Sequence, residues 1–172
     1  MSTPESPMSV PTTSPPTPAE VVKAVAAGVS RLVGGGLDPA QREEQVDQLA
    51  ALYGEVTDIR HPFAPFGDKP RFSRTGVREH FAAAQIPAES MTAVDMRVHE
   101  TADPEVVITE FRYEGTLDGR PFSWPSIFLT RVRDGVIVEA RDYTDHVGAA
   151  RAFGRLGALA SALAAEAALP AD

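Results

Sequence analysis

The stretch that decides the fold, residues 105–144, reads EVVITEFRYEGTLDGRPFSWPSIFLTRVRDGVIVEARDYT. It is rich in β-branched and aromatic residues, and Asp-Gly pairs interrupt it at 118–119 and 134–135. An Asp-Gly pair between two β-prone runs is a strong signal for a two-residue hairpin turn. The stretch therefore predicts three consecutive antiparallel strands, at Glu105–Gly115, Arg120–Arg133 and Val136–Thr144.

The residues before this stretch extend the sheet and then change to a helical period. Met91–Glu100 predicts a fourth strand, joined to the next through an Asp-Pro turn at 103–104. Apolar residues recur at helical spacing further upstream, and Asp38 followed by Pro39 is typical of a helix start. We expect helices over 19–33, 39–53, 75–84 and 146–169, and a short strand over 55–63.

The order of these elements predicts the fold class. Helices come first, then a strand and a short helix, then four long strands and a closing helix. We expect an α+β domain in which helices gather on one face of a cone-shaped, strongly curved antiparallel sheet. Such an arrangement encloses a pocket suited to a small ligand.

Composition narrows the class of protein. The 172 residues carry a formal charge of −8 and suit one domain, over residues 19–169. Residues 1–18, with six prolines, predict a disordered Pro/Ser/Thr-rich leader. The sequence has no basic stripe of the kind that binds nucleic acids, and no apolar run in it is long enough for a membrane span. Without cysteine or a secretory signal, we expect a cytoplasmic protein.

Three segments carry a family resemblance: HPF at 61–63 with TGVREHF at 75–81, RDGVIVE at 133–139, and RDYTD at 141–145. With the order of elements, they resemble the nuclear-transport-factor-2-like superfamily, in particular its SnoaL-like and limonene-epoxide-hydrolase-like branch. The resemblance spans about residues 19–156 and implies a cystatin-like α+β barrel. This superfamily holds isomerases, cyclases, hydrolases, dehydratases and non-catalytic binders, so the resemblance does not settle the reaction.

Asp142 is the leading candidate for a catalytic residue. Alternation along a strand places it on one face with Val138, Ala140 and Thr144, and we expect that face to line the pocket. Burial would raise the pKa of its carboxyl toward a range useful for proton transfer. The resemblance adds that epoxide hydrolases of this superfamily use the aspartate of a matching Arg-Asp-Tyr segment. The alternative is that Asp142 pairs with an arginine or caps a turn.

His61 is the second catalytic candidate, because it lies near the end of the first predicted strand, before a Pro-rich loop. From there it could hydrogen-bond a substrate oxygen or shuttle a proton. A core histidine bonded to backbone is the alternative. Tyr53, expected at the end of the second helix, is a candidate ligand contact. The alternative is that it is an aromatic residue of the core. With Asp58 on the strand face opposite His61, the base and donors of a ketosteroid isomerase are incomplete.

Aromatic side chains are candidates for the ligand-binding wall. Alternation puts Phe122, Trp124, Ser126 and Phe128 on one strand face, where Trp124 could stack on a flat substrate and Ser126 could offer a hydroxyl. Core packing is the stronger alternative for Phe128. Pro125 suggests a bulge or an edge position.

The strand around 106–113 bears on whether the protein could hydrolyse an epoxide. In the preferred register Phe111 and Tyr113 face inward as ligand contacts, while Glu110 and Arg112 face outward. The resemblance implies that epoxide hydrolases place an arginine and a second aspartate here on the pocket face. Without such a pair, epoxide hydrolysis becomes the least favoured reaction. In the alternative register, shifted by one residue, Glu110 and Arg112 would face inward and partly restore it.

The sequence thus predicts a cofactor-independent enzyme without a metal site that acts by proton transfer on an apolar or polycyclic metabolite. The reaction would be isomerisation, cyclisation, dehydration or hydrolysis. Two alternatives remain open: a non-catalytic binder of a hydrophobic small molecule, and an assembly module whose pocket is filled by side chains. Outward-facing Ile127 and Leu129 predict a homodimer through the convex sheet face.

Overall fold

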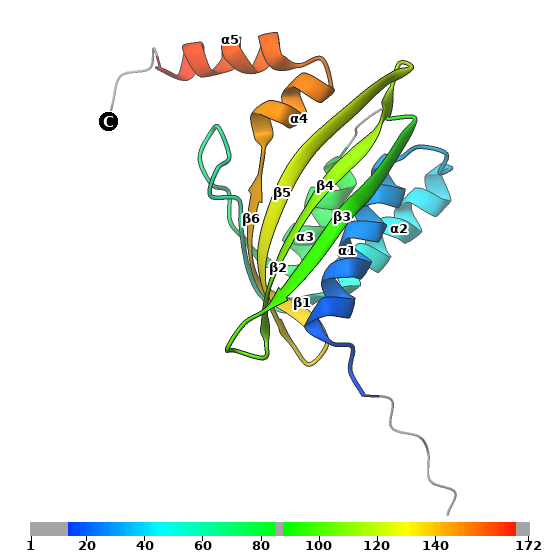
Figure 1. Cartoon of the computed structure of the whole chain (residues 1–172), viewed down its shortest axis with the longest axis vertical. Helices are drawn as coiled ribbons and strands as arrows, with labels where there is room; N and C mark the ends of the chain where they lie inside the picture. The colour runs from blue at the N-terminus through cyan, green and yellow to red at the C-terminus, as the bar shows by residue number, and fades with distance from the viewer. Residues whose placement is uncertain (1–13, 85–87, 168–172) are drawn as a thin grey trace, which may run out of the picture.

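The computed structural model describes residues 14–84 and 88–167 (Figure 1). Most of the predicted leader and residues 168–169 of the predicted closing helix lie outside this part of the chain. Along the described residues the elements are α1 (Pro18–Val33), α2 (Pro39–Ala51), β1 (Tyr53–Arg60), β2 (Arg71–Ser73), α3 (Arg74–Ala83), β3 (Ser90–Glu100), β4 (Val106–Leu117), β5 (Arg120–Arg133), β6 (Val136–Thr144), α4 (His146–Ala152) and α5 (Leu156–Ala167).

The strands form a curved, open sheet in the order β2-β1-β6-β5-β4-β3, with α1, α2 and α3 on its concave side (Figure 1). The predicted α+β class and the meander from β3 to β6 are confirmed. The sheet is mixed, however, because β1 pairs in parallel with β6. No local signal predicts that pairing, since some 75 residues separate the two strands in the sequence.

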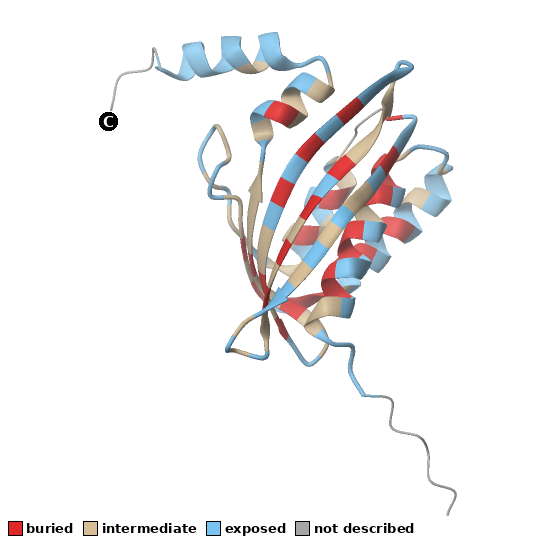
Figure 2. Cartoon of the chain, in the orientation of Figure 1, coloured by how far each residue is buried: buried red, intermediate tan, exposed pale blue. Residues whose placement is uncertain are grey.

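Both Asp-Gly turns form as predicted. Asp118 and Gly119 have φ of 50° and 70°, and Asp134 and Gly135 have φ of 50° and 78°. Positive φ at both central positions matches the twist of the flanking strands. Along β5, buried and exposed side chains alternate as expected for a strand with one buried face (Figure 2).

The helices bury their apolar faces against the sheet. Asp38 caps α2 as predicted, through a reciprocal pair of hydrogen bonds with Gln41. Val46 and Leu49 of α2 are each only 1% exposed and pack with Val21 of α1 in the main core. Replacing a leucine so buried by alanine typically costs about 2–5 kcal/mol. These helices therefore fix one wall of the space inside the sheet.

Several predicted boundaries are wrong, and tertiary contacts explain them. Tyr53 begins β1 instead of ending the second helix, because it pairs with Ile137 of β6. β1 ends at Arg60, which leaves His61 just beyond the strand. Residues 71–73, placed in a loop or unassigned, form β2 along the edge of β1.

Two further expectations fail near the end of the chain. The closing helix is broken into α4 and α5 at Gly154, whose φ of 64° is outside the helical range. Val138 does not share the face of Ala140, because a bulge shifts the β5–β6 register and puts Ile137 in the core instead.

Pro125 lies in no bulge, since β5 keeps a regular register with β4 there. It is tolerated because β6 ends at Thr144, opposite Ser126, so that no ladder bond of β6 needs an N–H from Pro125. The Pro125 carbonyl oxygen still accepts from the N–H of Asp145 at 3.3 Å.

Among the described residues, no helix is long and apolar enough to cross a membrane.

Gly115 of β4 provides a test of how closely β4 packs against Ser90 of β3 and Phe122 of β5. A Cβ at this position would collide with the Ser90 carbonyl oxygen and lie 2.5 Å from Cζ of Phe122. Gly115→Ala should therefore lower the free energy of unfolding by about 1–3 kcal/mol, as measured by urea denaturation. Gly157→Ala in α5 is the matched control, because nothing lies within 4 Å of its added methyl group. A Gly115→Ala protein as stable as the control would contradict the packing described.

Candidate functional site

A cavity of about 300 Å³ lies between the concave sheet face and the helices. Its wall is mainly apolar, and its few polar groups come from the ends of β1 and β6, from β2 and from α3 and α4. The lining residues are Val25, Val29, Leu32, Val33, Tyr53, Ile59, His61, Arg71, Val77, His80, Phe81, Ala84, Met91, Tyr113, Trp124, Phe128, Asp142, Thr144, His146, Ala149 and Phe153. Its size and lining are typical of a pocket for a small molecule.

Asp142 projects into this cavity from β6, opposite Phe128 of β5. Its side chain is 15% exposed, and no hydrogen bond joins its carboxyl group to another described residue. Burial raises the pKa of Asp142 to about 7, against the opposing effect of the Arg71 and Arg141 guanidinium groups. Arg141 itself points to the other face, where it binds Asp58 at 2.8 Å. The carboxyl group is thus poised to hold or release a proton near neutral pH.

His61 lies beside Asp142, with 3.9 Å between Nδ1 and Oδ2. The backbone N–H of His61 donates to Asp68, which fixes the start of the loop. Burial, with help from Arg71 and His146, lowers the pKa of His61 to about 4, so the imidazole is neutral at pH 7. The distance to Asp142 is too long for a direct hydrogen bond. A ligand oxygen could lie within hydrogen-bond distance of both groups.

Three more polar side chains meet at this end of the cavity. The ring of His61 lies 5.7 Å from that of His80 and 6.5 Å from that of His146. Nη2 of Arg71 lies 2.8 Å from Nδ1 of His80. Because a guanidinium group can only donate, this Nδ1 carries no proton. In the described part of the chain no group of acidic and histidine side chains is arranged to hold a metal ion.

Sequence reasoning missed Arg71, His80 and His146 as cavity residues. They come from β2, α3 and the start of α4, which only the tertiary fold brings together. His80 was visible as part of the 75–81 segment. Nothing in the spacing of the three residues linked them to Asp142.

Four of the predicted ligand contacts line the cavity, namely Trp124, Tyr113, Phe128 and Tyr53. The ring centroids of Tyr113 and Trp124 are 5.5 Å apart, and that of Phe153, the residue after α4, lies 5.2 Å from that of Trp124. Burial raises the pKa of both Tyr53 and Tyr113, so their hydroxyl groups stay protonated. These aromatic rings make one wall of the cavity flat and apolar.

The other two, Phe111 and Ser126, are buried but lie outside the cavity lining. Phe111 packs edge-on against Phe128 at 5.0 Å and supports the wall from behind. Ser126 is 1% exposed, and its Oγ lies 3.4 Å from that of Thr144.

The predicted register of β4 is confirmed. Phe111 and Tyr113 are buried, whereas Glu110 and Arg112 are on the convex face. Glu110 contacts His99 at 3.0 Å, and Arg112 contacts Asp95 at 2.8 Å. No arginine–carboxylate pair from β4 therefore reaches the cavity.

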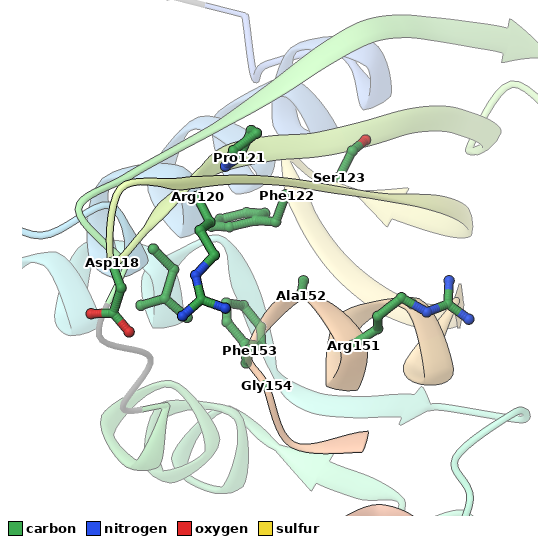
Figure 3. Close-up of a pocket in the computed structure, with 11 residues that line it drawn as sticks. Asp118, Arg120, Pro121, Phe122, Ser123, Arg151, Ala152, Phe153 and Gly154 are labelled. Atoms are coloured by element: carbon green, nitrogen blue, oxygen red, sulfur yellow. The ribbon is translucent and has the colours of Figure 1, made fainter. Parts of the chain in front are cut away.

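A second pocket, of about 340 Å³, lies between the β4–β5 turn and α4 (Figure 3). Arg120 extends toward Phe153 there, while Arg151 points away from the other labelled side chains (Figure 3). Of the candidate residues named from the sequence, Phe122 lines this pocket, whereas Asp142, His61 and Trp124 do not. The chemistry is therefore concentrated at the first cavity.

Comparisons with known proteins agree with this architecture. Residues 37–140 match the SnoaL-like domain family. An uncharacterised PhzA/B-like protein of Pseudomonas aeruginosa is 33% identical over 106 residues, which are 59% of this chain and 74% of that protein. The crystal structure of a provisionally assigned isomerase from Bacillus subtilis has a TM-score of 0.62 and 25% identity, covering 80% of this chain and 92% of the other. A provisionally assigned polyketide cyclase from Xanthomonas campestris has a TM-score of 0.57 at 13% identity, covering 81% and 96%.

The burial of Asp142 should be visible in the pH dependence of stability. Between its ordinary pKa of 3.8 and about 7, the folded protein binds a proton that the unfolded chain has lost, so this group lowers stability as pH rises. Asp142→Asn should therefore stabilise the protein increasingly from pH 4 to pH 7, by about 2–4 kcal/mol at the upper end. Urea denaturation at a series of pH values measures this.

The matched control is Asp118→Asn, in an exposed hairpin turn. Its effect on the free energy of unfolding should change little over the same range. An Asp142→Asn effect that is equally flat would show that the carboxyl group is not held in an apolar site.

Proposed function

The chain belongs to the SnoaL-like domain family, and from this premise we propose that it is an enzyme that moves protons on an apolar small molecule. Asp142 is the general acid or base, and His61 is its polar partner. The reaction is an isomerisation, cyclisation or dehydration that needs no group beyond the chain's own side chains.

One observation carries this proposal: a carboxyl group without a hydrogen-bond partner among the described residues lies on the wall of a 300 Å³ apolar cavity. With a pKa of about 7, Asp142 is present in both protonation states at neutral pH. Proton transfer is most efficient when the pKa of the catalytic group is near the working pH, and it typically contributes about 10²–10⁴-fold in rate.

The surrounding residues give this carboxyl group a defined task. Trp124, Tyr113 and Phe128 exclude water and hold a flat substrate body against β4 and β5. In an isomerisation or a cyclisation, Asp142 takes a proton from one substrate atom and returns it to another, so that no atoms are gained or lost. In a dehydration it delivers that proton to the hydroxyl group of the breaking C–O bond, which leaves as water. Neutral His61, with Nδ1 3.9 Å from the Asp142 carboxyl, hydrogen-bonds the substrate oxygen at which charge develops.

Epoxide hydrolysis is disfavoured on geometric grounds. It would need an arginine and a second carboxylate from β4 beside Asp142 to hold and activate a water molecule. Glu110 and Arg112 face away from the cavity and pair with His99 and Asp95.

A non-catalytic binder would use the same cavity, whereas an assembly module with a filled cone is disfavoured by the open space next to Asp142. Assembly remains part of the proposal in another form. Ile127 is 46% exposed on the convex face, and we expect that face to pair with a second copy of the chain.

The test is exchange of carbon-bound hydrogen in 2-tetralone, an apolar bicyclic ketone with acidic α-protons. In deuterated buffer at about pH 7, the wild-type protein should accelerate exchange at the α-carbons above the buffer rate, followed by proton NMR. Asp142→Asn should lose about 100-fold or more of this acceleration, because the amide cannot take up the proton.

Glu110→Gln is the matched control, since it removes a carboxyl group from the convex face, and it should exchange at the wild-type rate. Full activity in Asp142→Asn would refute the acid/base role. No acceleration by the wild-type protein over tetralone and smaller cyclic ketones would favour the non-catalytic binder.

A further inference from the structure

Arg71 differs from most other arginines in the described part of the chain. Eight others form ion pairs with carboxylates, whereas no described carboxylate lies within 4.0 Å of Arg71. Its Nη2 faces His80, but its Nη1 is buried and has no hydrogen-bond partner among the described residues. A buried guanidinium donor left unpaired is unfavourable, so such a group indicates a missing acceptor.

Arg42 shows how an arginine with a purely structural role is satisfied in the same fold. Its two terminal nitrogens donate to the carbonyl oxygens of Leu32 and Ala84, and so join α1, α2 and the end of α3. Nη1 of Arg71 has no such carbonyl partner, although it is buried. A structural role like that of Arg42 therefore does not explain why Nη1 of Arg71 is buried.

The position of Arg71 suggests what the missing acceptor is. Arg71 lines the inner cavity and also an outer pocket of about 230 Å³ under the loop at 61–70. His61, His80 and His146 line both spaces with it. Nε2 of His146 is a second buried atom there without a partner in the described chain. Two unsatisfied polar atoms thus lie where the apolar cavity meets the outer pocket.

We propose that Arg71, together with His146 of the same two linings, binds a carboxylate of the substrate, whose apolar body occupies the cavity lined by Trp124. This inference rests on the proposed function and specifies its substrate class as apolar carboxylic acids. A charge-assisted hydrogen bond to Nη1 would satisfy the buried donor.

The charges around Arg71 are consistent with an anionic ligand. Against the lowering effect of burial, the charges of Asp142 and Asp68 raise the pKa of Arg71, although neither carboxyl group is close enough to form an ion pair with it. Burial lowers the pKa of His61 and of His146, so these rings do not compete as cations. A bound carboxylate would offset the positive charge that Arg71 presents to Asp142.

The experiment compares two isosteric probes, 4-tert-butylcyclohexanecarboxylate and its neutral carboxamide. Neither absorbs at the excitation wavelength of tryptophan, and Trp124 is the single tryptophan of the chain and lines the cavity. Fluorescence titration at about pH 6 should give at least about tenfold tighter binding of the carboxylate by the wild-type protein. Equal affinity for both probes would overturn the proposal without any variant.

Arg71→Gln should remove the preference for the carboxylate and change binding of the amide less than about twofold. Arg71→Lys keeps the charge but loses the fork of donors, and it should retain part of the preference. The control Arg120→Gln lies in the second pocket, close to Phe153 (Figure 3). It should behave as wild type.

A preference that persists in Arg71→Gln, or that disappears in Arg120→Gln instead, would overturn the assignment. Far-ultraviolet circular dichroism checks that each variant is folded, and Arg71→Lys provides the test if Arg71→Gln is not. Because the titration measures binding alone, its failure would leave the role of Asp142 in proton transfer standing. Loss of the proton-transfer proposal would likewise leave the carboxylate preference standing.

Discussion

The pairing of β6 with two strands at once holds the sheet together and also creates the site. β6 is hydrogen-bonded to β5 on one side and to β1 on the other, so without it β1 and β2 would separate from the rest of the sheet. Arg141 reinforces this parallel pairing by donating to both the carboxylate and the backbone carbonyl of Asp58 at 2.8 Å. Because successive side chains alternate across a strand, an outward Arg141 forces Asp142 inward. The ion pair on the convex face and the carboxyl group in the cavity are therefore two results of one backbone register.

That register places an ionisable group where charge is poorly solvated. The apolar lining raises the pKa of Asp142, whereas Arg71 and Arg141 limit the rise. His61 next to it is kept neutral by the same burial. The site thus combines a carboxyl group that titrates near neutrality, a neutral imidazole and one half-buried cation. Proton transfer on an uncharged carbon framework needs such a set, and an oxyanion on the substrate would complete its charge balance.

Local chemistry made much of the fold predictable. The Asp-Gly turns, the Asp38 cap and the alternation of Phe111 with Tyr113 each follow from interactions within a few residues, and each is found in the structure. Pairing between distant segments was not predictable in the same way. The parallel β1–β6 ladder, the short strand β2 and the position of Tyr53 all depend on contacts across the molecule.

The same distinction between local signals and distant contacts applies to the candidate site. Asp142 could be proposed from its place on a strand, and His61 from its place where a predicted strand gives way to a Pro-rich loop. The face of Val138 was assigned wrongly, because a bulge shifts the alternation that sequence reasoning assumes. Arg71 and His146 escaped notice since their unpaired atoms are a property of the folded cavity and not of the sequence around them. The central claim is that the fold buries Asp142 enough to make it titrate near neutrality. Carbon-13 NMR titration of its side-chain carboxyl group, assigned by comparison with Asp142→Asn, measures this directly. The account predicts a pKa of about 7, and a value close to the ordinary 3.8 would contradict it.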